Sequence, residues 1–440
     1  MNVRRKSLFR LFVPICFENL FLMLTGMVDT LMLSSVGDNA VGAVGTANTY
    51  IGVFIIMFSI ISTGMLAVMT QNIGAGRPGV AWQAKQIALM FNAVIGIFMS
   101  LFLYAFAGKI LEVIGIAGNL NELASMYLKI VGGCCILNAL IPVFSAYLRA
   151  FSFTKESLVA SIIGNVLNFV LNAVFLFVLH WGVAGVAFAT VISRAVNLAI
   201  DIVLATVLIK AKNSPERESA KRVIRQIITV GLPAAMETAL YNIAMTLVIR
   251  FMNQMDSEGI NVTARSYTIQ ITNFSYCVGA ALAQSNAIMT GWRVGAGEFD
   301  ECSRGVRNAS IIGVCVAVLL ELIFALSGHW LLSILTDNQE IIDIAVKLLW
   351  IDIILECGRV TNMVYGQSLK TSGDAIFPVI MGIAFMFLCA VGGTYLFGIK
   401  MQLMAVGAYI AMALDECLRG VGMILRWKSG KWKTKSLVRG

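Results

Sequence analysis

Charged side chains are scarce in this sequence: Asp, Glu, Lys and Arg together make up 13% of its 440 residues, while 58% are hydrophobic. The mean hydropathy of +0.83 is far above that of an ordinary soluble domain, which excludes a water-soluble globular fold. The net charge of +9 would suit nucleic acid only if the basic residues formed one patch, but they are scattered through short segments. We therefore expect no nucleic-acid partner, and a chain that needs the lipid bilayer as its solvent.

Histidine is scarcer still. The only two, His180 and His329, each stand beside a tryptophan, which argues against a metal site built from imidazole ligands. The nine cysteines show no metal-ligand spacing, and most lie in apolar runs where cysteine behaves as a small hydrophobic residue. Because no nucleophile, base or metal set clusters, we expect neither an enzyme nor a cofactor other than a coupling ion.

Long apolar stretches, by contrast, are abundant. Twelve of them reach the roughly 20 residues that a helix needs to cross a membrane. They are predicted at 8–33, 48–72, 86–107, 122–148, 158–179, 182–210, 223–252, 262–290, 306–327, 338–368, 376–397 and 402–425. Lys and Arg concentrate before the first stretch, after every second one and in the tail. Both termini are therefore expected on the cytoplasmic side of the cell (plasma or inner) membrane.

Four landmarks recur in the same order at a separation of roughly 220 residues. Pro14-x-x-x-Glu18 is matched by Pro233-x-x-x-Glu237, Gly74-Ala75-Gly76 by Gly295-Ala296-Gly297, Leu148-Arg149 by Leu369-Lys370, and Gly185 by Gly407. Each match alone is weak, but the shared order indicates a duplication. We predict an all-α integral membrane fold, in which twelve transmembrane helices form two pseudo-symmetric six-helix bundles around a central cleft.

The predicted domains are an N-terminal six-helix lobe (1–210), a charged cytoplasmic linker (211–222), a C-terminal six-helix lobe (223–425) and a basic cytoplasmic tail (426–440). Pro14 and Pro233 each remove one helix hydrogen bond, so kinks that serve as hinges are expected in the first and seventh spans. Two bundles that rock about a cleft suit alternating access, whereas two fused bundles without transport are the alternative.

Ionisable residues inside spans are functional candidates, because a charge at mid-bilayer costs at least about 2.5–3.5 kcal/mol. Asp29 has no cationic residue one turn away and must find partners elsewhere. Asn165, Asn168 and Asn172 share one face of the fifth span. A desolvated carboxylate beside these amides would take up a proton, or would hold sodium through oxygen ligands. Alternatively, the amides only hold helices together.

Further ionisable residues are candidates for the substrate cleft. They are Glu18, Glu237 and, at i, i+4, i+7 spacing on one face of the tenth span, Asp352, Glu356 and Arg359. The alternative is that Glu356 and Arg359 neutralise each other as a structural contact. Arg194 and Asp201 are expected to form an internal structural pair.

Several motifs resemble those of bacterial multidrug and toxic compound extrusion (MATE) transporters, over almost the whole chain. They are Pro14, Met27-Val28-Asp29-Thr30, the run DNAVGAVG at 38–45, Gln71-Asn72-Ile73-Gly74-Ala75-Gly76, and Leu369-Lys370-Thr371-Ser372-Gly373-Asp374 with Pro378. The resemblance implies twelve helices in two six-helix lobes. It also implies export of organic, often cationic, compounds in exchange for inward sodium or protons.

The resemblance further implies a coupling-cation site in the first lobe. Several prokaryotic members use an Asp in the first helix, an Asn-x-x-x-Asp pair in the fifth and a Thr in the sixth. The matching positions here are Asp29, Asn168, Asn172 and Thr190, which would also be the ligands of a sodium ion. Asn172 stands where many relatives have Asp, so the choice between sodium and protons stays open. Leu240 and Arg359 stand at or near acidic positions of some relatives, which leaves a second-lobe cation site open as well.

The sequence therefore predicts a cation-coupled antiporter that exports cationic or amphipathic drug-like compounds by alternating access. Its expected partners are small organic substrates and the lipid bilayer, and it is expected to work as a monomer. Two alternatives are a flippase for lipid-linked saccharides, against which the few intramembrane cations argue, and an integral-membrane enzyme.

Overall fold

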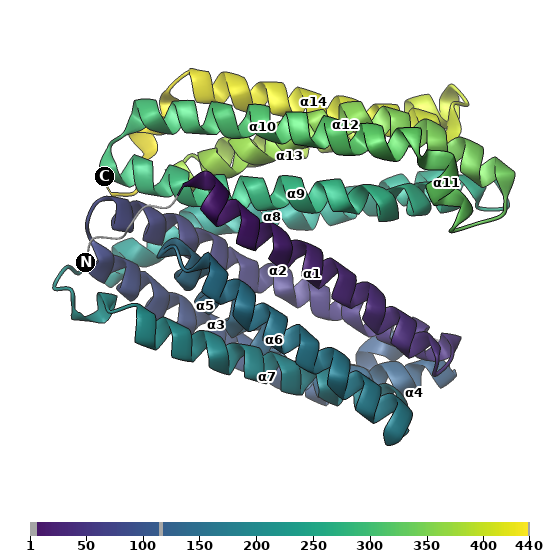
Figure 1. The fold of residues 1–440 in the computed structure, drawn as a ribbon, viewed down its shortest axis with the longest axis horizontal. Coiled ribbons are helices and arrows are strands. Elements are labelled where there is room, and N and C mark those ends of the chain that lie inside the picture. Colours follow the sequence, from purple (N-terminus) through teal and green to yellow (C-terminus); the bar gives the residue numbers. More distant parts are fainter. Residues whose placement is uncertain (1–6, 114–117, 439–440) are drawn as a thin grey trace. The chain divides into compact units, whose positions relative to one another are not determined.

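The computed structural model describes residues 7–113 and 118–438, and all regular structure in this part of the chain is helical (Figure 1). The first half contains α1 (Leu8–Ser34), α2 (Asp38–Gly74), α3 (Pro78–Val113), α4 (Gly118–Tyr127), α5 (Ile136–Ala150), α6 (Thr154–Ala173) and α7 (Gly182–Leu208). The second half contains α8 (Ala220–Met252), α9 (Ile260–Ala296), α10 (Phe299–Leu326), α11 (Gly328–Ser333), α12 (Gln339–Ser372), α13 (Ile376–Phe385) and α14 (Met404–Lys428). Stretches of π-helix follow α4 (Leu128–Gly132), α6 (Val174–Val178) and α13 (Met386–Val391 and Thr394–Lys400).

Every predicted span falls on one of these helices or on a helix pair, and the all-α fold class is confirmed. Eight helices of the described chain are long and apolar enough to cross a membrane: α1, α2, α3, α6, α7, α8, α10 and α13 with its π-helical continuation. The α4–α5 pair, bent by 45°, would be a ninth span. The three long helices that do not meet this criterion, α9, α12 and α14, carry more polar residues.

Two helices begin well before their predicted spans. The second span is predicted from residue 48, but α2 begins at Asp38, directly after Gly37 with φ of 134°. The third is predicted from residue 86, but α3 begins at Pro78. Proline suits the first helical turn, because the N–H that it lacks would have no helical partner there. Small and polar residues thus extend both helices beyond their apolar runs.

The prolines and the clearest helix break do not coincide. α1 and α8 continue as helices through Pro14 and Pro233, so a hinge at either residue stays a prediction. The 45° bend lies between α4 and α5, where a stretch of π-helix ends before Gly133. The fourth span is therefore a broken helix rather than the single straight helix that its composition suggests.

The chain forms two compact units, Met1–Ala235 and Met236–Gly440. The sequence predicts the boundary at the linker 211–222, whereas these units divide inside α8. The first part of α8 packs on α2, where Gly231 approaches the carbonyl of Ile60 and Gly64 approaches that of Ile227. A side chain at either glycine would overlap the opposite backbone, so only glycine permits this contact.

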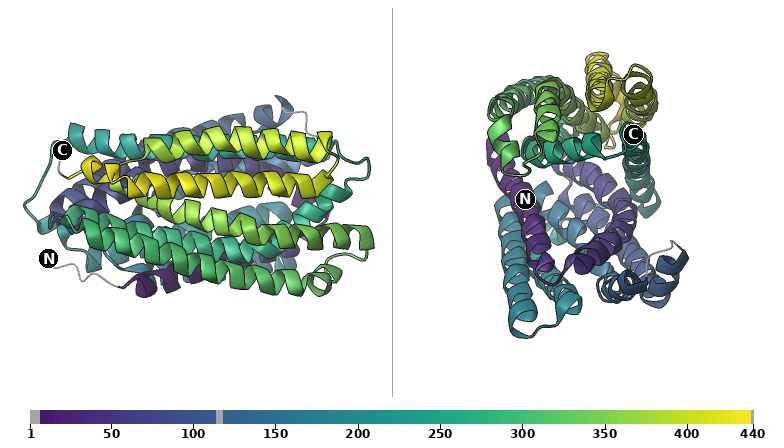
Figure 2. Two further views of the ribbon diagram at one scale, coloured as in Figure 1. Left: turned by 90° about the horizontal axis from the view of Figure 1, so that it is seen from above. Right: turned by 90° about the vertical axis from the view of Figure 1, so that its right-hand side faces the viewer.

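In the second unit, α12 packs most extensively against α14, α9 and α10, and these long helices lie lengthwise together (Figure 2). Much of the apolar core of this unit comes from the same helices. Leu348, Leu349 and Tyr409 are among its fully buried members, and the end of α8 adds Val248 and Met252. The most polar long helices, α9, α12 and α14, thus pack on one another, which allows their charged side chains to face protein rather than lipid.

The helix ends of the two units repeat the same turn. Gly76 and Gly297, which follow α2 and α9, have φ of 75° and 80°. The next residue along the chain donates its N–H to the carbonyl of Asn72 in one case and of Arg293 in the other, at 2.8 Å each. This left-handed cap favours glycine because a Cβ would be strained. The repeated Gly-Ala-Gly motif therefore encodes a repeated structure.

The Gly185 and Gly407 landmarks also have the same surroundings. A Cβ on Gly185 would lie 2.8 Å from Phe175 Cβ, and one on Gly407 would lie 2.6 Å from the carbonyl carbon of Phe397. Phe175 and Phe397 both belong to the π-helical end of the preceding helix. In each unit, a missing side chain therefore lets the last helix pack closely on the end of the helix before it.

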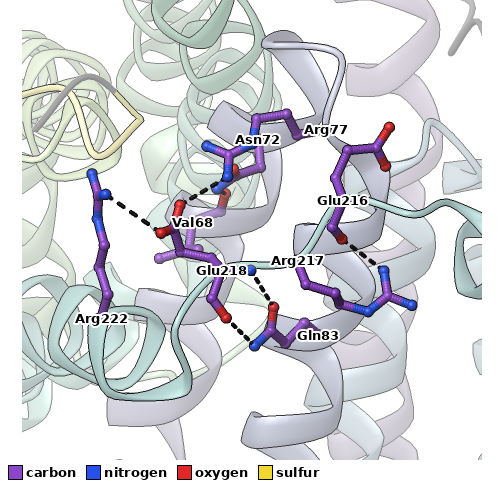
Figure 3. A network of polar contacts seen from close by, with 8 residues as sticks. All are labelled: Val68, Asn72, Arg77, Gln83, Glu216, Arg217, Glu218 and Arg222. Atoms are coloured by element: carbon purple, nitrogen blue, oxygen red, sulfur yellow. Dashed lines mark hydrogen bonds and ion pairs between the residues drawn. The ribbon is translucent and has the colours of Figure 1, made fainter.

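The linker between α7 and α8 is bound to the first unit by a polar network (Figure 3). Arg77 Nη2 donates to Glu218 Oε2 at 2.8 Å, and Arg222 Nη1 donates to Glu218 Oε1 at 3.4 Å. Gln83 Nε2 donates to the carbonyl of Glu218 at 2.7 Å, while the N–H of Glu218 donates back to Gln83 Oε1 at 3.0 Å. Arg77, directly before α3, thus holds the side chain of Glu218, and Gln83 in α3 holds its backbone.

The C-terminal tail is held differently. Trp432, which is fully buried, stacks on Trp427 with 4.1 Å between ring centroids, and it meets Phe299 edge-on at 5.6 Å. The Trp432 indole N–H donates to the carbonyl of Trp427 at 3.0 Å. Linker and tail each follow the last helix of a repeat, but one is held by charge and the other by aromatic packing.

Candidate functional site

Asp29 in α1 meets the amide face of α6. Asn172 Nδ2 donates to Asp29 Oδ1 at 2.9 Å and to Asn168 Oδ1 at 3.2 Å. Asn168 and Asn172 are 5% and 1% exposed, whereas Asp29 is half-buried. With the Asn168 amide turned over, its nitrogen would also donate to both Asp29 oxygens, at 3.0 and 3.2 Å. The structure thus brings Asp29, Asn168 and Asn172 together.

Two other predicted polar residues make contacts within their own helices. Asn165 Nδ2 donates to the carbonyl of Ser161 at 2.9 Å. Thr190 Oγ1 donates to the carbonyl of Val186 at 2.8 Å. In the described chain no hydrogen bond joins either of them to Asp29. The amide stripe of α6 is therefore divided between the Asp29 contact and a local helix contact.

A positive charge stands near this cluster. Arg194, one turn beyond Thr190 in α7, acts electrostatically on both Asp29 and Tyr127. Tyr127 is 3% exposed, and its hydroxyl donates to Asn48 Oδ1 at 3.4 Å. Asp29 is therefore not an isolated charge, because α7 supplies the cation that is absent from the neighbouring turns of α1.

The predicted pair of Arg194 and Asp201 is wrong. Asp201 is 1% exposed and neither of its carboxylate oxygens has a hydrogen-bond partner. The charges that act on it are those of Glu18 and Arg149. Residues seven apart are two helical turns apart along the axis, which is too far for direct contact on one straight helix.

The repeat landmarks supply one ion pair in each unit. Arg149 Nη2 lies 2.7 Å from Glu18 Oε1, and Lys370 Nζ lies 2.5 Å from Glu237 Oε2. The two acids are the matched residues of the Pro-x-x-x-Glu motifs, and the two bases are the matched residues of Leu-Arg and Leu-Lys. Lys370 thus serves as the partner of a half-buried acid as well as a topology marker.

The second unit encloses a cavity of about 460 Å³, a size that suits a drug-sized ligand. Side chains from α8, α9, α12, α14 and the α13 segment line it. The acids at its wall are Glu237, Asp352 and Glu416, and the bases are Arg265, Arg359, Lys370 and Arg419. Four methionines, Met245, Met363, Met386 and Met412, provide apolar surface. α9, α12 and α14 are polar for a membrane span because they build this wall.

Arg359 and Arg419 form a connected charge network. Arg359 lies 3.2 Å from Glu356 and 3.7 Å from Glu416. Arg419 lies 2.7 Å from Asp415 and 2.9 Å from Glu416. The predicted Glu356–Arg359 contact is therefore present, and it coexists with a place for Arg359 at the cavity. Glu356 itself is fully buried and is not part of the cavity wall.

Three charged residues at or near the second-unit cavity are not predicted from the sequence alone. Arg265 and Arg419 stand near span ends, where basic residues ordinarily mark loops. Glu321 is fully buried in α10, and both of its carboxylate oxygens lack a hydrogen-bond partner. The sequence could have indicated Glu321, because it is the single acid in the apolar run Val-Leu-Leu-Glu-Leu-Ile-Phe.

Of the predicted cleft residues, Glu237, Asp352 and Arg359 line the cavity, whereas Glu18 lies in the first unit.

Comparison with protein families gives one matching model, MatE, over residues 14–174 and 233–396. The two matched stretches begin at Pro14 and Pro233, the first landmark of each repeat. An uncharacterized transporter of Bacillus subtilis, YisQ, is 32% identical over 438 residues, covering 98% of this chain and 96% of the relative. A probable multidrug resistance protein NorM of Thermotoga maritima is 24% identical, covering 99% and 94%.

Solved structures show the same fold. One is described as the outward-facing conformation of a multidrug resistance MATE family transporter; it aligns with a TM-score of 0.85 at 18% identity, covering 96% of this chain and 95% of that one. Another, a transporter from Pyrococcus furiosus described as having a binding pocket of reverse polarity, aligns with a TM-score of 0.82 at 18% identity, covering 96% and 95%. At these identities the likeness concerns the fold alone.

Proposed function

The chain belongs to the MatE family of multidrug efflux transporters, and from this premise we propose that it is a cation-coupled antiporter that exports organic compounds by alternating access. The observation that carries the proposal is the 2.9 Å hydrogen bond from Asn172 to Asp29. It joins α6 to α1 through a carboxylate inside a membrane span, where an ionisable group is costly unless it has a function.

The coupling site consists of Asp29, Asn168 and Asn172, with Thr190 as a fourth candidate. When Asp29 is ionised and no ion is bound, amide N–H groups stabilise its negative charge. A proton neutralises the carboxylate and weakens these hydrogen bonds, and a sodium ion requires the amides to present oxygen rather than nitrogen. Occupancy by either ion therefore changes the contact between α1 and α6, which would bias one conformation of the transporter over another.

The coupling ion is sodium or a proton, since one carboxylate and two amides can serve either. Each inward positive charge releases about 2.3 kcal/mol per 100 mV of membrane potential. This energy would sustain roughly a fiftyfold gradient of exported substrate. We propose to compare export from proteoliposomes under an imposed sodium gradient with export under an imposed pH gradient. Export driven by neither gradient would contradict cation coupling.

The decisive variant is Asp29→Asn, which keeps the side-chain shape but removes the charge that binds the ion. We expect loss of gradient-driven export in inside-out vesicles with normal folding and membrane insertion. The matched control is Asp337→Asn, because Asp337 is exposed and lies in neither polar cluster. Full export by Asp29→Asn, or an equal loss in the control, would overturn the assignment of the coupling site.

The topology follows from the same proposal. We place both termini on the cytoplasmic side, because Lys and Arg are concentrated at the ends and in every second loop. Lobes 1–210 and 223–425 would then enter the membrane from the same side and move as two bodies within a monomer. Labelling of single cysteines introduced into the tail 426–440, in intact cells and in inverted vesicles, tests the orientation.

A further inference from the structure

The cavity of the second unit contains one cation that no described neighbour neutralises. Three of its four cations are paired: Lys370 with Glu237, Arg359 with Glu356 and Glu416, and Arg419 with Asp415 and Glu416. Arg265 in α9 has no such carboxylate in the described chain, and its Nε is buried without a hydrogen-bond partner. A guanidinium is always charged and has five N–H donors, so Arg265 presents an unfilled anion site to the cavity.

The opposite imbalance exists at Asp352 in α12. Asp352 is 2% exposed, lines the same cavity, and its Oδ2 has no hydrogen-bond partner. Its charged neighbours include two further buried acids, Glu321 and Glu356. Arg359 is the cation nearest to this group, and it already pairs with Glu356 and Glu416. The carboxylates around Asp352 therefore outnumber the cations available to them.

Arg265 and Asp352 do not neutralise each other. Both line the cavity and both act electrostatically on Tyr409, yet they form no ion pair within the described chain. Structural charges in a low-dielectric interior are normally paired, because an unpaired buried charge is costly. Two separate, opposite charges at one cavity are instead what a ligand with two opposite charges would require.

We propose that this cavity binds an amphipathic zwitterion. Its anionic group, such as a carboxylate, binds the Arg265 guanidinium, and its protonated amine binds Asp352. Its apolar body lies on the flexible methionine side chains, which can adapt to different shapes. A volume of about 460 Å³ accommodates such a molecule. This inference names the substrate class of the proposed exporter and rests on that function only for the direction of transport.

Three fluorescent probes of matched shape test the charge requirement. Nε-dansyl-lysine is the zwitterion, dansylcadaverine lacks its carboxylate, and dansyl-6-aminohexanoic acid lacks its amine. We expect purified protein in detergent to bind the zwitterion roughly tenfold or more tightly than either singly charged probe, because each loses one charge-assisted contact. Equal binding of all three probes, or tightest binding of dansylcadaverine, would overturn the proposal.

Variants locate the two ends of the ligand. Arg265→Gln should weaken binding of the zwitterion and of the anionic probe about tenfold but leave the cationic probe unchanged. Asp352→Asn should weaken binding of the zwitterion and of the cationic probe but leave the anionic probe unchanged. The matched control is Arg250→Gln, because Arg250 is an exposed arginine of the same unit that does not line the cavity. Equal effects of Arg265→Gln on all three probes would refute the assignment.

Failure of this inference can be told apart from failure of the proposed function. Binding is measured on purified protein without any ion gradient, so the ranking of the three probes does not depend on whether export is coupled to a cation. Export by cation coupling without preference for the zwitterion would refute only the substrate class. If a cavity variant does not fold, the ranking of the three probes on the unmodified protein still shows whether the cavity prefers a zwitterion.

Discussion

The two units are built on one repeat, yet their polar interiors differ. Both keep the landmark ion pair, Glu18 with Arg149 in the first and Glu237 with Lys370 in the second. Beyond that pair, the first unit gathers one carboxylate and two amides on α1 and α6, whereas the second places five further charged side chains around a cavity. The duplication therefore preserved the backbone and one charge contact while the remaining polar positions diverged.

This divergence explains why helix polarity is unequal between the repeats. α2 and α7 are apolar enough to cross a membrane unaided, but their counterparts in the second unit, α9 and α14, are not. Charged residues on a span are tolerated when they face protein or water rather than lipid, and those of the second unit form ion pairs within and between the helices that line the cavity. The two proposals together assign ion binding to the first unit and substrate binding to the second.

The largest expected difference between the units concerns the landmark ion pair. The Glu18 side chain is 5% exposed, while the Glu237 side chain is 18% exposed and faces the cavity. Arg149→Gln would leave Glu18 as an uncompensated buried charge beside Asp201, which should lower the free energy of unfolding by about 3–5 kcal/mol. Lys370→Gln should cost clearly less, because Glu237 retains contact with the cavity. Thermal unfolding of both variants in detergent measures the difference.

The double variant Glu18→Gln with Arg149→Gln is the control for this prediction. It removes both charges together, so most of the lost stability should return if the unpaired acid is the cause. A double variant as unstable as Arg149→Gln alone would show that the arginine acts through other contacts. Equal losses for Arg149→Gln and Lys370→Gln would remove the proposed difference in burial between the two pairs.

Much of this architecture follows from the sequence because lipid permits few solutions. Apolar length fixes the helices, and the repeated Gly-Ala-Gly and Pro-x-x-x-Glu motifs identify the duplication. The contact of Asp29 with α6 can also be predicted from the sequence, because a lone acid and an amide stripe inside spans must each find a polar partner. Hydropathy alone does not predict that α2 starts at Asp38 and α3 at Pro78, because small and polar residues extend both helices beyond their apolar runs.

The second-unit cavity is the part that sequence reasoning cannot place. Its wall combines residues from helices far apart in the chain, and which ionisable residues converge depends on how α8, α9, α12 and α14 pack. Arg265 has the sequence context of a loop residue, and Lys370 that of a topology marker. Proximity in the sequence is also a poor guide to ion pairs. Arg194 and Asp201 look like partners on one helix, but the charges that act on Asp201 come from Glu18 and Arg149.

A smaller effect should distinguish the two close-packed glycines. A Cβ at Gly407 would meet backbone atoms of Phe397 and Gly398, whereas one at Gly185 would first meet the Phe175 side chain. Backbone can yield less than a side chain, so Gly407→Ala should destabilise the protein by about 1–3 kcal/mol and Gly185→Ala by less. Unfolding midpoints of both variants test this order. The reverse order would mean that the π-helical end of α13 adjusts more easily than that of α6.

The smallest effect concerns how the linker and the tail are attached. The hydrogen bond from Arg77, aided by the charge of Arg222, lowers the pKa of Glu218 below its ordinary value of 4.5. A carboxyl with a lowered pKa stabilises the folded state fully above its unfolded pKa and loses that contribution as the pH falls through the lowered value. The linker should therefore loosen only in acid, whereas the tail, held by Trp432 stacking, should not respond.

Glu218→Gln should reproduce the acid state of the linker at neutral pH. We expect hydrogen exchange to rise a few-fold at 214–219 and to stay unchanged at 431–437, with little change in overall stability because the contact is partly exposed. An exposed ion pair contributes little by itself, and the two backbone bonds to Gln83 remain in this variant. Unchanged exchange in the linker would therefore mean that Gln83 alone holds it, and adding Gln83→Ala would then be expected to release it.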